Sequence, residues 1–201
     1  MNTANKLTMT RIFLTVILIV LLLFPFYTVN IEFPKILLGT ITVDVKYLVA
    51  AGLFLIASIT DAIDGHVARK YNMVTDFGKL TDALADKALV NSSLIILSVQ
   101  GFITPAIPVI IIFRDTIVDS IKMLAASKGK VVAAIKTGKV KTACLMSGIV
   151  LTFCYNLPFE LFNLDIANFL LILATIFAVV SGIEYYIMNK DVVFEKNVEN
   201  K

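Results

Sequence analysis

Long apolar stretches alternate with short polar segments along almost the whole 201-residue chain. A helix that crosses a bilayer needs about 20 predominantly apolar residues, and each of these stretches comes close to that length. No segment sustains the alternation of apolar and polar residues that is typical of a half-buried strand. We therefore expect six membrane-spanning helices, at about 12–29, 45–60, 81–99, 105–126, 142–157 and 166–188.

The composition agrees with an integral membrane protein. Hydrophobic residues make up 58% of the chain, charged residues make up 16%, and the mean hydropathy is +0.88. A soluble domain usually carries about a quarter charged residues. Six spans leave only short loops and exclude a large extramembrane domain. The expected fold is therefore all-α, with one six-span domain over 1–201, a juxtamembrane segment at 1–11 along the membrane interface, and a cytoplasmic tail at 189–201.

Lysine and arginine collect in alternate polar segments. Segments 1–11, 65–80, 122–141 and 189–201 together contain 14 of the 18 Lys and Arg residues. Cytoplasmic loops of membrane proteins carry such an excess of positive charge. We therefore expect a multi-pass protein of the cell membrane with both termini in the cytoplasm, which requires an even number of spans.

Four carboxylates stand where the second predicted span ends and the third begins. Asp61 and Asp64 are three residues apart, and Asp82 and Asp86 are four apart, so each pair lies on one face of its helix. A charged residue within a membrane helix is costly and by default marks a functional site. The short connection between the pairs contains turn-forming residues. We expect the two spans to be antiparallel neighbours, with both pairs in one polar cavity at the cytoplasmic side.

The four carboxylates predict a metal site. They would repel one another strongly at neutral pH, so a cation must compensate them. Oxygen ligands alone favour Mg²⁺, Mn²⁺ or Ca²⁺, and two ions bridged by shared carboxylates would suit an in-line phosphoryl displacement. One or two interfacial aspartates are often charges that reach the headgroup layer, but four at these spacings rarely are. The single histidine, His66, excludes a zinc or haem site built on His and Cys.

A motif of eight positions runs from the end of the second predicted span into the third. Its residues are Asp61, Asp64, Gly65, Ala68, Arg69, Gly78, Asp82 and Asp86. Written with its spacing, D-x2-D-G-x2-A-R-x8-G-x3-D-x3-D, it resembles the signature of the CDP-alcohol phosphatidyltransferase family. That family is also built on six spans, so the resemblance covers nearly the whole chain.

The resemblance implies a phosphatidyl transfer, in which an alcohol attacks the β-phosphorus of a CDP-activated lipid and CMP leaves. It assigns Asp61, Asp64, Asp82 and Asp86 to two Mg²⁺ or Mn²⁺ ions. It also gives Asp86 the position of the general base that accepts the proton of the attacking hydroxyl. The residues that it assigns to the CDP-lipid are Asp61, Asp64, Gly65, Arg69, Thr75 and Gly78.

Basic residues farther along the chain are candidates for binding the acceptor. Arg114-Asp115 and the stretch 138–142 resemble segments of bacterial family members that use glycerol-3-phosphate. A cluster of Arg114, Lys139 and Lys141 near the metal would suit this dianion. The implied reaction joins CDP-diacylglycerol and sn-glycerol-3-phosphate to give phosphatidylglycerophosphate and CMP.

Alternative functions stay open at this stage. Lys122 and Leu145 stand where those bacterial relatives have arginine and glutamine, so inositol phosphate or phosphatidylglycerol could be the acceptor. A membrane prenyltransferase also uses Asp-rich helices with Mg²⁺, but its motifs lie far apart in a longer chain. A transporter would more often show repeats and broken helices near the midplane. The resemblance also implies a homodimer surrounded by membrane lipids, and no nucleic-acid partner is expected.

Overall fold

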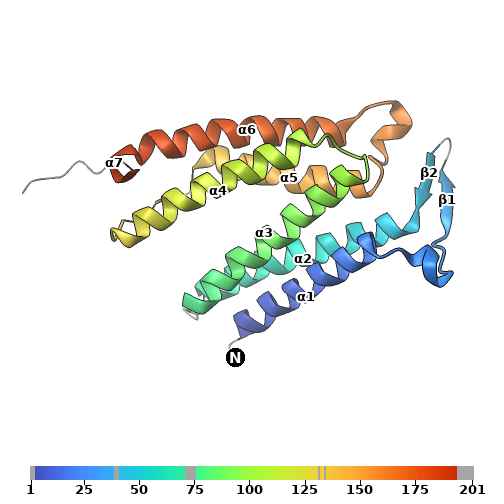
Figure 1. Cartoon of the computed structure of the whole chain (residues 1–201), viewed down its shortest axis with the longest axis horizontal. Helices are drawn as coiled ribbons and strands as arrows, with labels where there is room; N and C mark the ends of the chain where they lie inside the picture. Colours follow the sequence, from blue (N-terminus) through green and yellow to red (C-terminus); the bar gives the residue numbers. More distant parts are fainter. Residues whose placement is uncertain (1–2, 39–40, 71–75, 131, 134, 194–201) are drawn as a thin grey trace, which may run out of the picture.

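Six long helices make up most of the structure (Figure 1). The structure is a computed structural model that describes residues 3–38, 41–70, 76–130, 132–133 and 135–193. The side chains of residues 3–7, 61–70, 76–80, 82 and 192–193 lie outside this description. The long helices are α1 (Thr3–Leu23), α2 (Val45–Lys70), α3 (Asp76–Val99), α4 (Ala106–Ser127), α5 (Lys136–Phe153) and α6 (Ile166–Met188).

Each predicted apolar stretch lies largely within one of these helices, so the pattern located all six. Of the described helices, α6 alone is long and apolar enough to cross a bilayer by length and composition. The apolar parts of α1 and α2, Thr8–Leu23 and Val45–Thr60, are shorter. Helices α3, α4 and α5 carry charged side chains within their length, because these helices supply the residues of the candidate site described below.

The first helix differs from its prediction at both ends. It begins at Thr3 and runs without a break into the predicted span, so residues 3–11 belong to the same helix as that span. It ends at Leu23 rather than near Val29, and a 3-10 turn, η1 (Phe26–Val29), follows. Pro25 explains the early end, because proline disfavours helical backbone in the residue before it and has no N–H to donate.

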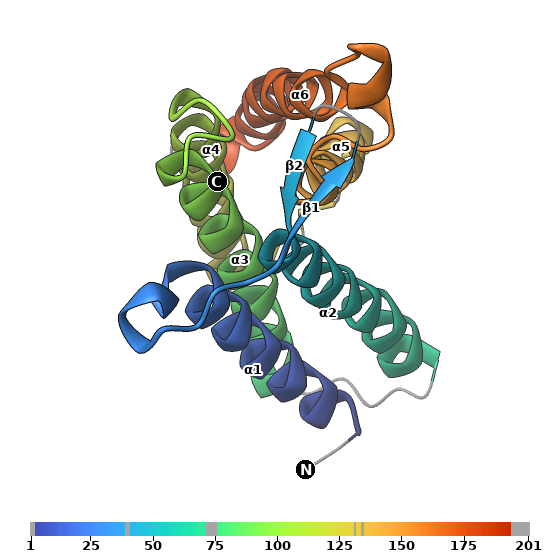
Figure 2. The same ribbon diagram turned by 90° about the vertical axis from the view of Figure 1, so that its right-hand side faces the viewer.

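A short β-hairpin corrects the expectation that the chain contains no strands. Strands β1 (Lys35–Leu38) and β2 (Ile41–Asp44) pair antiparallel, with Lys35 opposite Asp44. Each strand has four residues, too few for an alternating pattern to stand out in the sequence. Isoleucine, threonine and valine supply the β-branched side chains that favour extended backbone. Figure 2 shows the hairpin across one end of the helices.

The helices pack as two groups, α1 with α2 and α3, and α4 with α5 and α6 (Figures 1 and 2). Helices α5 and α6 approach closely at Gly148, where an added Cβ would lie 2.8 Å from the Leu171 side chain. The rings of Phe54 in α2 and Phe153 in α5, 6.1 Å apart, connect the two groups. Buried apolar residues from all six long helices form one continuous core.

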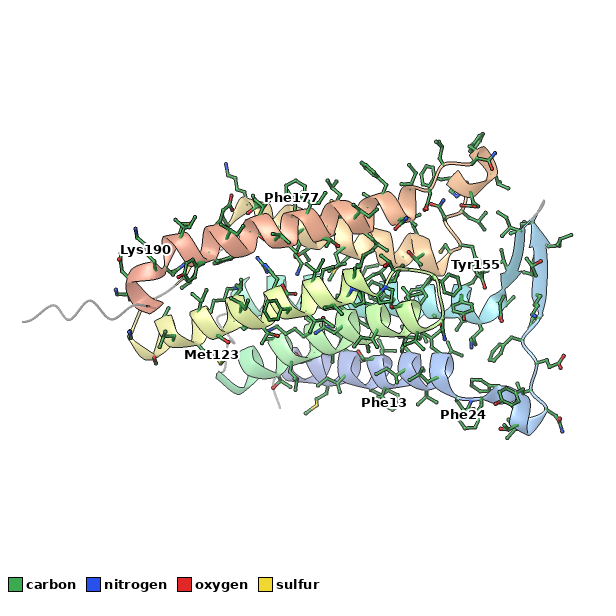
Figure 3. The ribbon with its side chains drawn as sticks, turned by 45° about the horizontal axis from the view of Figure 1, so that its top comes forward. Phe13, Phe24, Met123, Tyr155, Phe177 and Lys190 are labelled. Carbon is green, nitrogen blue, oxygen red and sulfur yellow. The ribbon has the colours of Figure 1, made fainter. Side chains whose placement is uncertain are left out.

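The two ends of the helix bundle differ in charge. The start of α1, the last turns of α2 and α4, and the short helix α7 (Lys190–Val193) lie toward one end, whereas the hairpin and the 3-10 turn η2 (Phe159–Phe162) lie at the other (Figure 1). Lys190 and Tyr155 mark these opposite ends in Figure 3. The described parts of the Lys- and Arg-rich segments 1–11, 65–80, 122–141 and 189–201 therefore belong to the end with α7. We term this the basic end.

Candidate active site

A cavity of about 530 Å³ opens between α4, α5 and α6 near the basic end. Arg114 and Lys122 of α4 line it, together with Lys139 and Lys141 of α5 and Tyr185 of α6. We term it the basic cavity. The structure thus brings together the three residues that were predicted to bind the acceptor phosphate, although they come from two helices and are far apart in sequence.

A buried ion network fixes two of these cations. The Lys141 ammonium donates to both carboxylate oxygens of Asp115, at 2.8 and 2.7 Å. Arg114 Nη1 donates to Asp115 Oδ1 at 2.8 Å. Lys141 is only 5% exposed, so the carboxylate is needed there to compensate a charge that would be very costly to bury alone. The network ties α4 to α5 and holds both cations against the cavity.

Arg114 also binds the last of the long helices. Its Nε donates to the Ala178 carbonyl at 3.1 Å, and its Nη2 donates to Ser181 Oγ at 2.7 Å. An added Cβ at Gly182 would lie 3.1 Å from Arg114 Cγ, so glycine at this position lets the arginine side chain lie against α6. The guanidinium plane is therefore held by two helices at once.

Both cations keep donors for an anion. A guanidinium has five N–H donors and an ammonium has three. Among the described residues, three of the Arg114 donors and two of the Lys141 donors have acceptors. The remaining donors, together with Lys122 and the exposed Lys139, leave the cavity with more positive than negative charge. Such a cluster suits a phosphate group, which accepts several charge-assisted hydrogen bonds.

Sequence reasoning did not place Lys122 and Tyr185 in the site. The Lys122 ammonium lies 5.2 Å from the centre of the Tyr185 ring, and the Arg114 guanidinium carbon lies 5.6 Å from it. Lys122 follows Arg114 by about two helical turns, and this helical spacing was the sequence signal that could have placed Lys122 near Arg114. Tyr185 offered none, because an aromatic residue at the end of an apolar helix is also typical of a membrane interface.

The predicted base, Asp86, interacts electrostatically with one residue of the basic cavity and is not among the residues that line it. Asp86 is half-buried on α3 and lies within electrostatic range of Lys141. Its neighbour Lys87 forms an ion pair with Asp119 of α4, one turn beyond Asp115. The Lys87–Asp119 ion pair connects α3 to α4 next to the Asp115 network, on the helix that carries Asp86.

The other motif residues fall outside the described side chains. Helices α2 and α3 are antiparallel neighbours that pack against each other, as the short connection predicted. Within the described part of the chain, no three His, Cys, Asp or Glu side chains are close enough to hold a metal ion. The residues concerned are Asp61, Asp64, Gly65 and Arg69 at the end of α2, Gly78 and Asp82 at the start of α3, and Thr75, which lies wholly outside the described residues.

The donor chemistry of the motif fits a hard divalent cation. Asp86 is the one predicted metal ligand whose side chain is described, and its carboxylate oxygens are the ligand type that Mg²⁺ and Mn²⁺ prefer. The other three predicted ligands are also aspartates and lie on the two neighbouring helices. The residue types and their helices are therefore compatible with an oxygen-ligated ion at this place.

Comparisons with known proteins agree with the motif. The family model for CDP-alcohol phosphatidyltransferase matches residues 1–181. The chain is 42% identical over 189 residues to the CDP-diacylglycerol–glycerol-3-phosphate 3-phosphatidyltransferase of Bacillus subtilis, covering 94% of this chain and 95% of that protein. It is 30% identical over 186 residues to the protein of the same name from Rickettsia typhi, covering 92% and 95% of the two chains. This chain belongs to the CDP-alcohol phosphatidyltransferase family.

Proposed function

We propose that this protein transfers the phosphatidyl group of CDP-diacylglycerol to sn-glycerol-3-phosphate, giving phosphatidylglycerophosphate and CMP. The observation that carries the choice of acceptor is the basic cavity, whose four cations suit a phosphorylated alcohol. The names of the relatives from Bacillus subtilis and Rickettsia typhi support the same reaction. Asp115 is the anionic partner of Arg114 and Lys141, and an acceptor without a phosphate monoester would leave the remaining positive charge of the cavity uncompensated.

The motif aspartates are the proposed ligands of a divalent cation. Asp61, Asp64, Asp82 and Asp86 would hold Mg²⁺ or Mn²⁺, as two ions, between α2 and α3. When bound, the ions supply charge stabilisation at the diphosphate. Gly65, Arg69, Thr75 and Gly78 are the remaining proposed contacts of the CDP-lipid.

The chain's own groups account for the acceptor's chemistry. In the proposed reaction, the acceptor hydroxyl oxygen forms a bond to the β-phosphorus of the CDP-lipid, and the bond from that phosphorus to the CMP oxygen breaks. Asp86 accepts the hydroxyl proton. Arg114, Lys139 and Lys141 hold the acceptor's phosphate, which keeps the attacking hydroxyl in reach of Asp86 and supplies part of the rate through positioning.

The proposed setting is a bilayer crossed by all six long helices, with the basic end in the cytoplasm. Large apolar side chains lie exposed on the outside of the bundle, as Phe13 does at 65% exposure, pointing away from the other helices in Figure 3. A surface of this kind is suited to lipid chains. The acyl chains of the donor would remain in the bilayer while its headgroup enters the site.

This arrangement predicts opposite locations for two segments. A reporter that is active only in the cytoplasm should give signal when fused after Lys201 and none when inserted in the 158–165 loop. The reason is that six spans place both termini on the cytoplasmic side, whereas the loop between the fifth and sixth spans lies on the opposite side. A periplasm-active or exterior-active reporter at the same two positions provides the matched control and should give the reverse pattern. The same location for both segments would contradict the six-span arrangement.

The acceptor is tested by assaying purified protein with labelled CDP-diacylglycerol and a panel of alcohols. We expect CMP release with glycerol-3-phosphate, little with inositol phosphate or phosphatidylglycerol, and none in excess EDTA. Restoring Mg²⁺ or Mn²⁺ should restore turnover, which separates metal removal from denaturation. Faster turnover with another acceptor would overturn the proposed substrate, and full activity in EDTA would overturn the metal site.

A further inference from the structure

Tyr185 is the one aromatic residue among those that line the basic cavity, within the part of the chain that the structure describes. It lies in the last turn of α6 and is 4% exposed, so its ring is enclosed by the elements around the cavity. It also lies beyond residues 1–181, the region that the family model matches. Its role is therefore not contained in the motif that identified the family.

The Tyr185 ring holds two cations of the cavity without neutralising them. Lys122 and Arg114 both lie within cation–π range of it, at 5.2 and 5.6 Å from the ring centre. An aromatic face attracts a cation through its quadrupole and carries no net charge. A carboxylate in the same place would fix the cations equally well but would cancel the potential that attracts an anion. The ring therefore orders Lys122 while its ammonium donors remain available.

The Tyr185 hydroxyl reaches a third element of the cavity. The backbone N–H of Ile135 donates to it at 3.4 Å, and Ile135 is the residue that precedes the first turn of α5. That turn leads directly to Lys139 and Lys141. One side chain of α6 thus contacts α4 through its ring and the start of α5 through its hydroxyl, and these two elements supply all four cations.

We propose that Tyr185 is a positioning residue that fixes Lys122 and Arg114 as a preformed receptor for the acceptor's phosphate group. This inference rests on the proposed function and adds Lys122 to the acceptor site. The ring sets the affinity for a phosphorylated acceptor and takes no part in the bond-making step. Its loss should therefore weaken acceptor binding and leave the turnover of bound substrates intact.

The test compares Tyr185→Leu, which removes the ring, with Tyr185→Phe, which keeps it. In steady-state assays we expect Tyr185→Leu to raise KM for glycerol-3-phosphate by about tenfold, the effect of losing two partly desolvated cation–π contacts. The kcat and KM for CDP-diacylglycerol should stay within about twofold of wild type. Tyr185→Phe keeps the ring and loses the contact with Ile135, so it should raise KM for glycerol-3-phosphate clearly less than Tyr185→Leu does. A merely structural role would instead lower kcat or alter both KM values together.

Lys122→Gln keeps the test decisive if Tyr185→Leu does not fold. Lys122 is exposed, so this variant should keep the fold, and it should raise KM for glycerol-3-phosphate several-fold. Where both variants fold, the effect of the double variant on KM should be smaller than the product of the single effects, because the ring acts partly through this cation. An unchanged KM in Lys122→Gln, or equal KM values for Tyr185→Leu and Tyr185→Phe, would overturn the proposal.

Equilibrium binding of inorganic phosphate separates this proposal from the proposed reaction. Isothermal titration of the purified protein should show phosphate binding that weakens about tenfold in Tyr185→Leu and is retained in Tyr185→Phe. If the wild-type protein binds phosphate in this way but does not turn over glycerol-3-phosphate, the acceptor is wrong and the role of Tyr185 stands. If Tyr185→Leu binds phosphate as tightly as wild type, the role of Tyr185 is wrong whatever the acceptor.

Discussion

Asp86→Asn should lower kcat for phosphatidyl transfer by roughly 10²–10⁴ while CDP-diacylglycerol still binds, since this is the usual effect of losing a general base. Asparagine retains the shape of the side chain and one oxygen that can bind a metal, but it cannot accept the proton of the acceptor hydroxyl. Near a divalent cation, a carboxylate is deprotonated at neutral pH and ready for that role. The Lys87–Asp119 ion pair beside it remains, so the fold should be kept. The measurement is kcat from CMP release, with the thermal stability of the variant.

A metal titration distinguishes a base from a ligand at this position. If Asp86 only held an ion, additional Mg²⁺ or Mn²⁺ would restore the turnover of Asp86→Asn. We expect no such recovery. Asp191→Asn is a matched control, because it makes the same chemical change at an exposed residue of α7, away from the residues that line the basic cavity. Near-complete recovery at high metal concentration would make Asp86 a ligand rather than the base.

Lys141→Gln should raise KM for glycerol-3-phosphate by roughly tenfold to a hundredfold, because hydrogen bonds to charged groups contribute about 1.5–3 kcal/mol. The substitution removes a buried ammonium that lines the basic cavity. It leaves Asp115 paired with Arg114, at 2.8 Å, so this carboxylate is not left without a counter-ion. The KM for CDP-diacylglycerol should change far less, because we propose that this substrate binds through the motif at α2 and α3.

Lys136→Gln is the control for this charge change. Lys136 lies in the first turn of the same helix and is exposed, and it is not among the residues that line the basic cavity. Its substitution lowers the net charge equally, so a general electrostatic effect on an anionic substrate would appear in both variants. If Lys141→Gln left KM for glycerol-3-phosphate unchanged, or raised both KM values alike, Lys141 would be a structural partner of Asp115 and no part of the acceptor site.

The helices were predictable because a bilayer imposes a simple length rule. An apolar stretch of nearly the length that spans the hydrocarbon core predicts a helix, because a helix satisfies its backbone hydrogen bonds internally. Each such stretch of this chain lies largely within a helix. The boundaries were less predictable. The first helix ends at Leu23 because of Pro25, a local effect, yet the hairpin at Lys35–Asp44 consists of strands too short to produce a readable alternation.

The sequence alone was sufficient for the family, because its motif is local. The aspartates lie on the last turns of one helix and the first turns of the next. Spacing along the chain is therefore enough to predict that Asp61 and Asp64 share one face of their helix, and that Asp82 and Asp86 share one face of theirs. The proposed acceptor residues Arg114, Lys139 and Lys141 could be named only by resemblance. Nothing in their spacing predicts that α4 and α5 come together around Asp115.

What the sequence by itself determined is therefore the family and the six helices, each of which follows from residues within one helix or two consecutive ones. The metal chemistry of the Asp motif stays a prediction. The tertiary structure decided which cations share a cavity and how they are held. Lys141 is buried only because Asp115 of another helix compensates its charge, and Arg114 reaches α6 only because Gly182 leaves room for it. Lys122 and Arg114 meet on the Tyr185 ring through the packing of α4 against α6. Such contacts join residues far apart in sequence, and the free energy that selects them comes from packing between helices, which no local pattern records.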